Sequence, residues 1–234
     1  MASHPNVDPR ETARFAALAA RWWDAEGAFR ALHEINPLRL RFVEERTPLA
    51  GARFLDVGCG GGIFSEALAR RGAEVTGLDA AEDTLEVARL HMIEEGLCID
   101  YRFGTAEALA VEHPERYDTV ACMELLEHVP DPASLVRACA ELARPGAGIF
   151  FSTLNRTPKS FLLGIVAAEH VLELLPRGTH DYARFIRPSE LDALGRAAGL
   201  TLREVAGIRY NPLTRSVSLG RDLGVNYLAW FVKE

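Results

Sequence analysis

The stretch Asp56-Val57-Gly58-Cys59-Gly60-Gly61-Gly62 decides the fold, because it joins an apolar run to a helical pattern. Residues 53–57 predict a strand, and residues 63–70 predict a helix that stops at Gly72. Glycines carry no Cβ atom, so a ligand can approach their backbone, and the start of a helix offers N–H groups without a helical partner. We therefore expect a ligand-binding turn after the first strand.

A second acidic position sharpens this expectation. Residues 74–79 predict the next strand, and it ends in Asp79, whose carboxylate could accept hydrogen bonds from both hydroxyls of a ribose. Together the turn and Asp79 indicate a cofactor that contains adenosine; the alternative is a tight turn beside a solvated carboxylate. The Walker pattern G-x-x-x-x-G-K-[S/T] is absent, because the residue five positions after Gly58 is Ile63 and not the glycine of a Gly-Lys pair.

Strand and helix patterns alternate outward from this turn. Strands are expected at residues 99–103, 117–122, 148–153, 202–209 and 227–233, and helices at residues 84–95, 131–142 and 188–198. This order predicts an α/β fold with a doubly wound, Rossmann-like sheet of seven strands. Residues 1–48 predict an N-terminal helical cap with a break at Asn36-Pro37, and residues 49–234 the main domain. Within it, residues 154–187 form an insertion too long for an ordinary loop, expected to act as a lid.

Composition excludes several classes of protein. The 234 residues are 48% hydrophobic and carry a formal net charge of −7, which argues against disorder and against binding of nucleic acid. Four scattered cysteines without a C-x-x-C pair favour a reducing compartment, so we expect a cytoplasmic protein. No apolar run approaches the roughly 20 residues of a membrane span.

The segment after the fourth predicted strand holds three ionisable side chains close together in the sequence. Glu124, Glu127 and His128 stand at i, i+3 and i+4, so a helical turn would place them on one face. Such a set could hold Mg²⁺ or a similar divalent ion. Alternatively, His128 or Glu127 is a general base, or the segment is only a polar turn before a helix cap at Asp131.

The turn Asp-x-Gly-x-Gly-x-Gly resembles the first motif of the class I S-adenosylmethionine-dependent methyltransferases. Residues 21–46, 55–62, 123–132, 152–156 and 178–181 resemble, more narrowly, the O-methyltransferase family of ubiquinone biosynthesis, and the likeness extends over nearly the whole chain. That family acts on a polyprenylated hydroxyphenol and on demethylubiquinol. Ala147 departs from the family, where a glycine is usual.

The resemblance implies roles for individual residues. The cofactor S-adenosylmethionine would contact Arg39, Asp56, Gly58, Gly60, Gly62, Asp79 and Met123. A metal ion, expected to be Mg²⁺, would be held by Glu124, Glu127 and His128. The candidates for catalysis are His128, Glu127 and His180, with His33 a weaker one, whereas Trp22 and Trp23 are expected to pack within the cap.

Methyl transfer to a phenol explains why such groups are needed. A phenol with a pKa near 10 is about three units from ionisation at pH 7, which costs about 4 kcal/mol that a base or a metal ion must offset. A catechol offers two adjacent oxygens, which favours a metal site over a lone base. The alternatives are methylation of another small acceptor, an NAD-dependent dehydrogenase, and a cofactor-binding protein without catalysis.

Residues 161–175 form the most hydrophobic segment of the chain and lie within the insertion. As a helix, they would carry a stripe of Phe161, Ile165, Ala168, Leu172 and Leu175. We expect either an ordinary lid helix or a peripheral contact with lipid at the inner face of the membrane, where it would admit a prenylated substrate. A biosynthetic complex would be a further partner.

Overall fold

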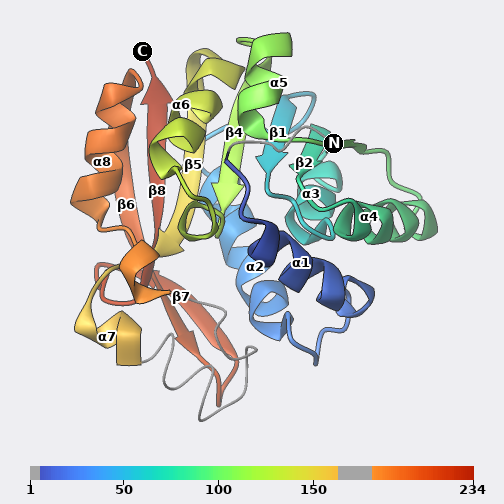
Figure 1. The fold of residues 1–234 in the computed structure, drawn as a ribbon, viewed down its shortest axis with the longest axis horizontal. Coiled ribbons are helices and arrows are strands. Elements are labelled where there is room, and N and C mark those ends of the chain that lie inside the picture. Colours follow the sequence, from blue (N-terminus) through green and yellow to red (C-terminus); the bar gives the residue numbers. More distant parts are fainter. Residues whose placement is uncertain (1–5, 163–180) are drawn as a thin grey trace.

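The computed structural model describes residues 6–162 and 181–234, and its centre is an eight-stranded mixed sheet in the order β3-β2-β1-β4-β5-β8-β6-β7 (Figure 1). The first five strands are parallel, whereas β8 runs antiparallel to β5 and β6 runs antiparallel to β8 and β7. The strands are β1 (Arg53–Val57), β2 (Glu74–Asp79), β3 (Asp100–Phe103), β4 (Tyr117–Met123), β5 (Ala143–Leu154), β6 (Leu200–Asn211), β7 (Ser216–Gly220) and β8 (Asn226–Lys233).

Helices cover both faces of this sheet, which confirms the doubly wound α/β class (Figure 1). The helices are α1 (Pro9–Leu18), α2 (Arg30–Glu44), α3 (Ile63–Ala69), α4 (Glu82–Glu94), α5 (Ala106–Glu112), α6 (Pro132–Leu142), α7 (Pro158–Ser160) and α8 (Pro188–Ala197). The described residues also form the short 3₁₀ turns η1 (Ala19–Arg21), η2 (Leu126–His128) and η4 (Tyr182–Arg184). Neighbouring strand residues point to opposite faces, so Phe150 packs in the core beneath α2 and α3, whereas Phe151 packs in the core beneath α6 and α8.

The structure departs from the predicted elements at three places. The predicted break at Asn36-Pro37 is wrong, because α2 continues through Pro37. A proline inside a helix costs about 3 kcal/mol, but burial of Ile35 and Leu38 on either side recovers about 1.5–3 kcal/mol each. The sequence also did not predict β7 or α5; the polar, partly exposed β7 makes the sheet one strand wider than expected.

The register of the parallel strands gathers the sequence motifs at one edge of the sheet. Val57 pairs with Leu78 and with Cys122, so the residues that follow β1, β2 and β4 leave the sheet side by side. In doubly wound sheets ligands bind at the carboxyl ends of the strands. Among the described residues, none of the helices is long and apolar enough to cross a membrane.

Candidate cofactor and acceptor site

The glycine turn after β1 leaves no room for side chains. Gly60 and Gly62 have φ angles of 53° and 90°, the left-handed region that favours glycine. A Cβ atom on Gly60 would lie 2.2 Å from Trp22 Cζ2, and one on Gly62 would lie 2.2 Å from Tyr101 Oη. Trp22 and Tyr101 therefore pack directly against the backbone of the turn, which only glycine permits, and Gly58 and Gly60 also line the cavity described below.

Asp79 is fixed against this turn at the end of β2. Its carboxylate accepts hydrogen bonds from the backbone N–H of Gly60 at 2.8 Å and of Ala81 at 2.9 Å. Burial raises the pKa of Asp79 above its ordinary value, although these backbone donors oppose the shift. The sequence thus placed the carboxylate correctly beside the turn, where a ribose would meet it.

Asp56 lies behind the turn and is buried. Ser65 Oγ donates to its carboxylate at 2.6 Å, from the first turns of α3. Burial raises the pKa of Asp56 to about 6, and the charge of Asp79 acts in the same direction, whereas the Ser65 hydrogen bond and the charge of Arg39 oppose the shift. An anionic side chain held in so apolar a place can attract a cationic ligand.

Arg39 and Glu124 form an ion pair across the end of β4. Arg39 reaches from α2 and its Nη2 lies 2.8 Å from Glu124 Oε1, while Ser152 Oγ donates to the same oxygen at 2.8 Å. Glu124 has a φ of 52°, so it cannot belong to a helical turn with its successors. The prediction of one helical face for Glu124, Glu127 and His128 is therefore wrong; only the latter two lie in η2.

Glu127 and His128 are both buried, and each has a protein partner. Thr153 Oγ1 donates to Glu127 Oε2 at 2.7 Å, whereas Glu127 Oε1 has no hydrogen-bond partner among the described residues. Burial, followed by the charge of Glu124, raises the pKa of Glu127. Burial would lower the pKa of His128, but Glu11, 2.9 Å from its Nδ1, and the neighbouring carboxylates raise it overall.

These contacts test the predicted metal set. Glu124 is held by Arg39 and Ser152, Glu127 by Thr153, and His128 by Glu11, so the three side chains do not converge. Over residues 6–162 and 181–234, no group of three or more His, Cys, Asp and Glu side chains is placed to hold a metal ion. The described arrangement therefore does not fit Mg²⁺.

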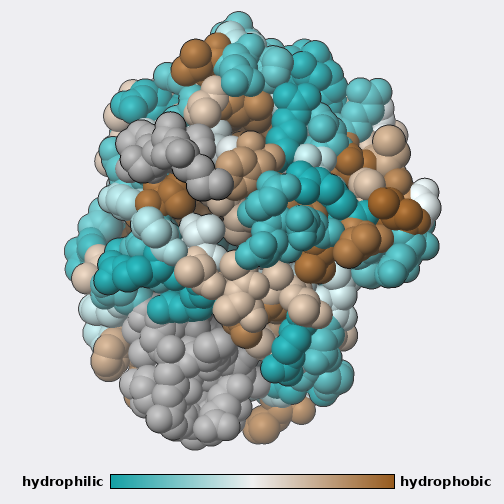
Figure 2. All heavy atoms as spheres, turned by 45° about the vertical axis from the view of Figure 1, so that its right-hand side comes forward, coloured by the Kyte–Doolittle hydropathy of each residue, from teal (hydrophilic) through white to brown (hydrophobic). Residues whose placement is uncertain are grey.

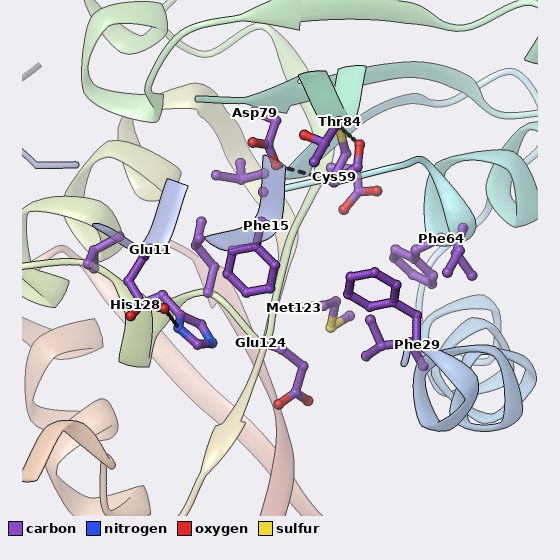
Figure 3. Close-up of a pocket in the computed structure, with 18 of the residues that line it drawn as sticks. Glu11, Phe15, Phe29, Cys59, Phe64, Asp79, Thr84, Met123, Glu124 and His128 are labelled. Carbon is purple, nitrogen blue, oxygen red and sulfur yellow. Dashed lines mark hydrogen bonds and ion pairs between the residues drawn. The ribbon is translucent and has the colours of Figure 1, made fainter. Parts of the chain in front are cut away.

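A cavity of about 620 Å³ joins the two halves of the site. Figure 3 shows Asp79 at one side and Glu124 with His128 at the other, and Phe15 and Met123 between them. The predicted residues that line it are Arg39, Asp56, Gly58, Gly60, Asp79, Met123, Glu124 and His128. Gly62 and Glu127 do not line it, and His180 lies outside the described residues. The volume lies within the range of ordinary small-molecule sites.

The N-terminal residues form one wall of this cavity, which sequence reasoning missed. Asn6 Nδ2 donates to Glu107 Oε1 at 2.6 Å and to the carbonyl of Asp131, whose N–H donates back to Asn6 Oδ1. Farther along, Glu11 contacts His128, and the ring of Phe15 packs nearly perpendicular to the same imidazole (Figure 3). The only local signal was the start of α1, where Asp8 caps the helix before Pro9.

Trp22 packs on a residue of the N-terminal segment, as expected, whereas Trp23 also packs against the main domain, which the sequence did not predict. Trp22 stacks on Phe29 and also lines the cavity. Trp23 stacks on His91 and donates to the carbonyl of Gly61 at 3.0 Å, so it holds the glycine turn from outside. His33 Nε2 lies 2.9 Å from the carbonyl of Trp22, a contact within the cap.

The chain is similar in sequence to a known protein family and to named enzymes. Residues 27–205 match the family described as a methyltransferase domain. The chain is 58% identical over 229 residues to the ubiquinone biosynthesis O-methyltransferase of Stutzerimonas stutzeri, covering 98% of this chain and 99% of that protein. It is 59% identical over 223 residues to the enzyme of that name from Azotobacter vinelandii, covering 95% and 96%.

Solved structures support the fold. Magnesium protoporphyrin IX methyltransferase from Synechocystis, solved with bound S-adenosylhomocysteine, matches with a TM-score of 0.67 at 17% identity, over 96% of this chain and 100% of that one. A possible histamine N-methyltransferase from Thermotoga maritima matches with a TM-score of 0.67 at 23% identity, over 96% and 99%. The fold, the full-length identity and the methyltransferase domain agree, so the chain belongs to the ubiquinone biosynthesis O-methyltransferase family of S-adenosylmethionine-dependent methyltransferases.

Proposed function

We propose that the chain transfers the methyl group of S-adenosylmethionine to a catechol-type oxygen of polyprenylated ubiquinone precursors, in both O-methylation steps. The acceptors would be 2-polyprenyl-6-hydroxyphenol and 3-demethylubiquinol. The observation that carries this proposal is one cavity in which the cofactor-type turn with Asp79 faces the carboxylate of Glu124 and the imidazole of His128. The printed names of the relatives support the same substrate class.

The cofactor would lie along the carboxyl edge of the sheet. When bound, it supplies a sulfonium methyl group that an oxygen nucleophile can attack. Asp79 would hold the ribose hydroxyls, the bare backbone at Gly58 and Gly60 would admit the chain of the methionine part, and buried Asp56 would favour its positive charge. Positioning of the two reactants in one cavity would supply several kcal/mol of the barrier reduction.

His128 is the residue that we propose as general base. It lines the cavity, and Glu11 orients its imidazole and raises its pKa, which favours acceptance of a proton from a phenol. Glu127, buried behind it, would stabilise the imidazolium that forms. His180 stays a proposal for a second acid or base.

Binding of Mg²⁺ also stays a proposal, and no step above depends on it. The orphaned Glu127 Oε1 and the mutual repulsion of the Glu124 and Glu127 carboxylates favour a cation nearby. To ligate one, Glu124 would have to leave Arg39, and His128 would have to leave Glu11.

Replacing His128 by alanine is expected to lower kcat about 100-fold and to leave the affinity for S-adenosylhomocysteine within about twofold, because a general base contributes about that factor. The assay uses labelled S-adenosylmethionine and a short-chain demethylubiquinol, with and without Mg²⁺. His113→Ala is the matched control, since His113 contacts Arg102 and does not line the cavity. Equal turnover by the His128 variant would show that His128 is not the general base. A rate independent of Mg²⁺ would show that no metal ion takes part in the reaction.

We further propose that residues 1–48 act as a cap and the insertion 154–187 as a lid that contacts membrane lipid. The described start of the insertion leaves Phe161 and Leu162 exposed at 45% and 57%. Figure 2 shows hydrophobic groups interspersed with hydrophilic ones on one face of the molecule. The rest of the predicted apolar stripe, residues 163–175, lies outside the described residues.

Changing both Phe161 and Leu162 to serine is expected to lower co-sedimentation with anionic liposomes about tenfold, because two apolar side chains lose their insertion into the interface. The control changes Leu90 and Ile93 to serine; these are exposed at 63% and 68% on α4. Equal losses for both pairs, or none for the first, would contradict membrane contact at the insertion.

A further inference from the structure

The guanidinium of Arg39 is buried but incompletely used. The residue is 5% exposed, its Nη2 donates to Glu124 Oε1 at 2.8 Å, and its Nε is buried without a hydrogen-bond partner among the described residues. A buried cation with an unused donor is costly unless another acceptor completes its shell. This unused donor indicates a second anionic partner that is not part of the chain.

The position of Arg39 identifies the kind of partner. Its charge lowers the pKa of Asp56, so it lies near the residue that begins the glycine turn, and it also lines the cavity. Asp79, the ribose end, lies across the cavity from Glu124 (Figure 3). A cofactor whose ribose is on Asp79 therefore extends its amino-acid end past Asp56 toward Arg39.

Of the other arginines and lysines that line the cavity, Arg209 is exposed to solvent, and the remaining two have carboxylate partners of their own. Arg14 pairs with Glu11, and Lys159 pairs with Asp222. Both side chains are also more exposed than Arg39, at 31% and 51% against 6%, so water screens their charge more strongly. Arg39 is the better placed cation for the cofactor's carboxylate.

We propose that Arg39 exchanges partners when the cofactor binds: its guanidinium moves from Glu124 to the α-carboxylate of the cofactor and so releases Glu124 to the acceptor half of the cavity. This exchange rests on the proposed function, and it couples the cofactor half of the cavity to the acceptor half. Without cofactor, Arg39 neutralises Glu124. With cofactor, Glu124 regains a free charge beside His128, where a hydroxyl of the acceptor can donate to it. The exchange makes cofactor binding precede productive acceptor binding.

The proposal has an unusual consequence for affinity. Glu124 competes with the cofactor for Arg39, so removal of its charge should tighten cofactor binding, although the residue lies in the site. A charge-assisted hydrogen bond that no longer has to be broken corresponds to roughly tenfold in affinity. The change Glu124→Gln keeps the length of the side chain and an amide that can still meet Ser152.

Isothermal titration with S-adenosylhomocysteine tests this exchange. Glu124→Gln is expected to bind about tenfold more tightly than the unmodified chain, whereas Arg39→Gln binds about tenfold more weakly. Added to Arg39→Gln, the Glu124 change should have no further effect, because the competition needs the guanidinium. The matched control is Glu107→Gln, which removes an equal charge from a cavity residue that pairs with Asn6 instead of Arg39.

A second ligand separates competition from a general change in charge. 5′-Methylthioadenosine shares the adenosine and the sulfur but has no carboxylate, so its affinity should be unchanged by Glu124→Gln. Glu124→Asn, which suits the φ of 52°, repeats the test if the glutamine variant folds poorly. Equal or weaker binding of S-adenosylhomocysteine by both variants, or equal tightening of both ligands, overturns the exchange. If the unmodified chain binds neither ligand, the proposed function itself fails.

Discussion

Asp79→Asn is expected to weaken binding of S-adenosylhomocysteine about 100-fold while the fold stays intact. The charged carboxylate would accept from two ribose hydroxyls, and each hydrogen bond to a charged group contributes about 1.5–3 kcal/mol, of which the neutral amide retains a part. The amide oxygen can still accept from the backbone N–H of Gly60 or Ala81, so the turn keeps one of its two ties. Titration calorimetry measures the loss.

Asp83→Asn serves as its control. Asp83 is an exposed acid in the first turn of α4, a few residues beyond Asp79, and it does not line the cavity. We expect affinity within about twofold of the unmodified chain for this variant. Should the Asp79 variant bind equally well, the ribose would have to lie elsewhere, and the orientation given to the cofactor along the sheet edge would be wrong.

Asp56→Asn is expected to stabilise the protein by about 2–3 kcal/mol at pH 7 to 8. Burial raises the pKa of Asp56 from 3.8 to about 6, so ionisation is harder in the folded chain than in the unfolded one. The free energy of unfolding therefore falls as the pH rises from about 4 to about 6 and stays low above it. An amide does not ionise, and this penalty disappears.

Urea unfolding at pH 4 and at pH 8 checks the sign of this effect. The gain for Asp56→Asn should be present at pH 8 and nearly absent at pH 4. Asp118→Asn is a control of opposite sign, because hydrogen bonds and charges from Arg53 hold the pKa of Asp118 below its ordinary value. That change should lower stability at pH 8. Equal gains for Asp56→Asn at both pH values would contradict the raised pKa.

The stability lost at Asp56 agrees with the role proposed for it in the cofactor site. The same burial that opposes ionisation would strengthen the attraction of the carboxylate for the positive charge of S-adenosylmethionine. Stabilising changes at binding sites commonly cost function. The Asp56 variant should accordingly bind S-adenosylmethionine, with its sulfonium charge, more weakly than the unmodified chain does.

The sequence predicted the first parallel strands of the sheet well because they are apolar runs closed by polar or glycine residues. The strands Arg53–Val57 and Glu74–Asp79 coincide with the predicted ones. The strand Ser216–Gly220 was not predicted, since its alternation of serine with Val217 and Leu219 is short and it lies at the partly exposed edge. Edge strands carry a weaker pattern because only part of their surface is buried.

Some residues of the candidate site were likewise predicted from the sequence, and others were not. Gly58, Asp79 and Met123 were placed together because the carboxyl ends of parallel strands meet at one edge. Glu124 was misplaced because the helical spacing ignored the backbone, which only turns into η2 two residues later. Glu11, which holds His128 across 117 positions of sequence, leaves no local pattern that could have revealed it.

One measurement tests the central claim most directly: incubation of the chain with S-adenosylmethionine that carries a deuterated methyl group, together with a short-chain demethylubiquinol, followed by mass spectrometry of the product. We expect the labelled methyl group on a ring oxygen, one S-adenosylhomocysteine formed for each product, and loss of both signals at low cofactor concentration in the Asp79→Asn variant. Recovery of the label on carbon, or binding of the cofactor without transfer to the quinol under any condition, would contradict O-methylation in this cavity.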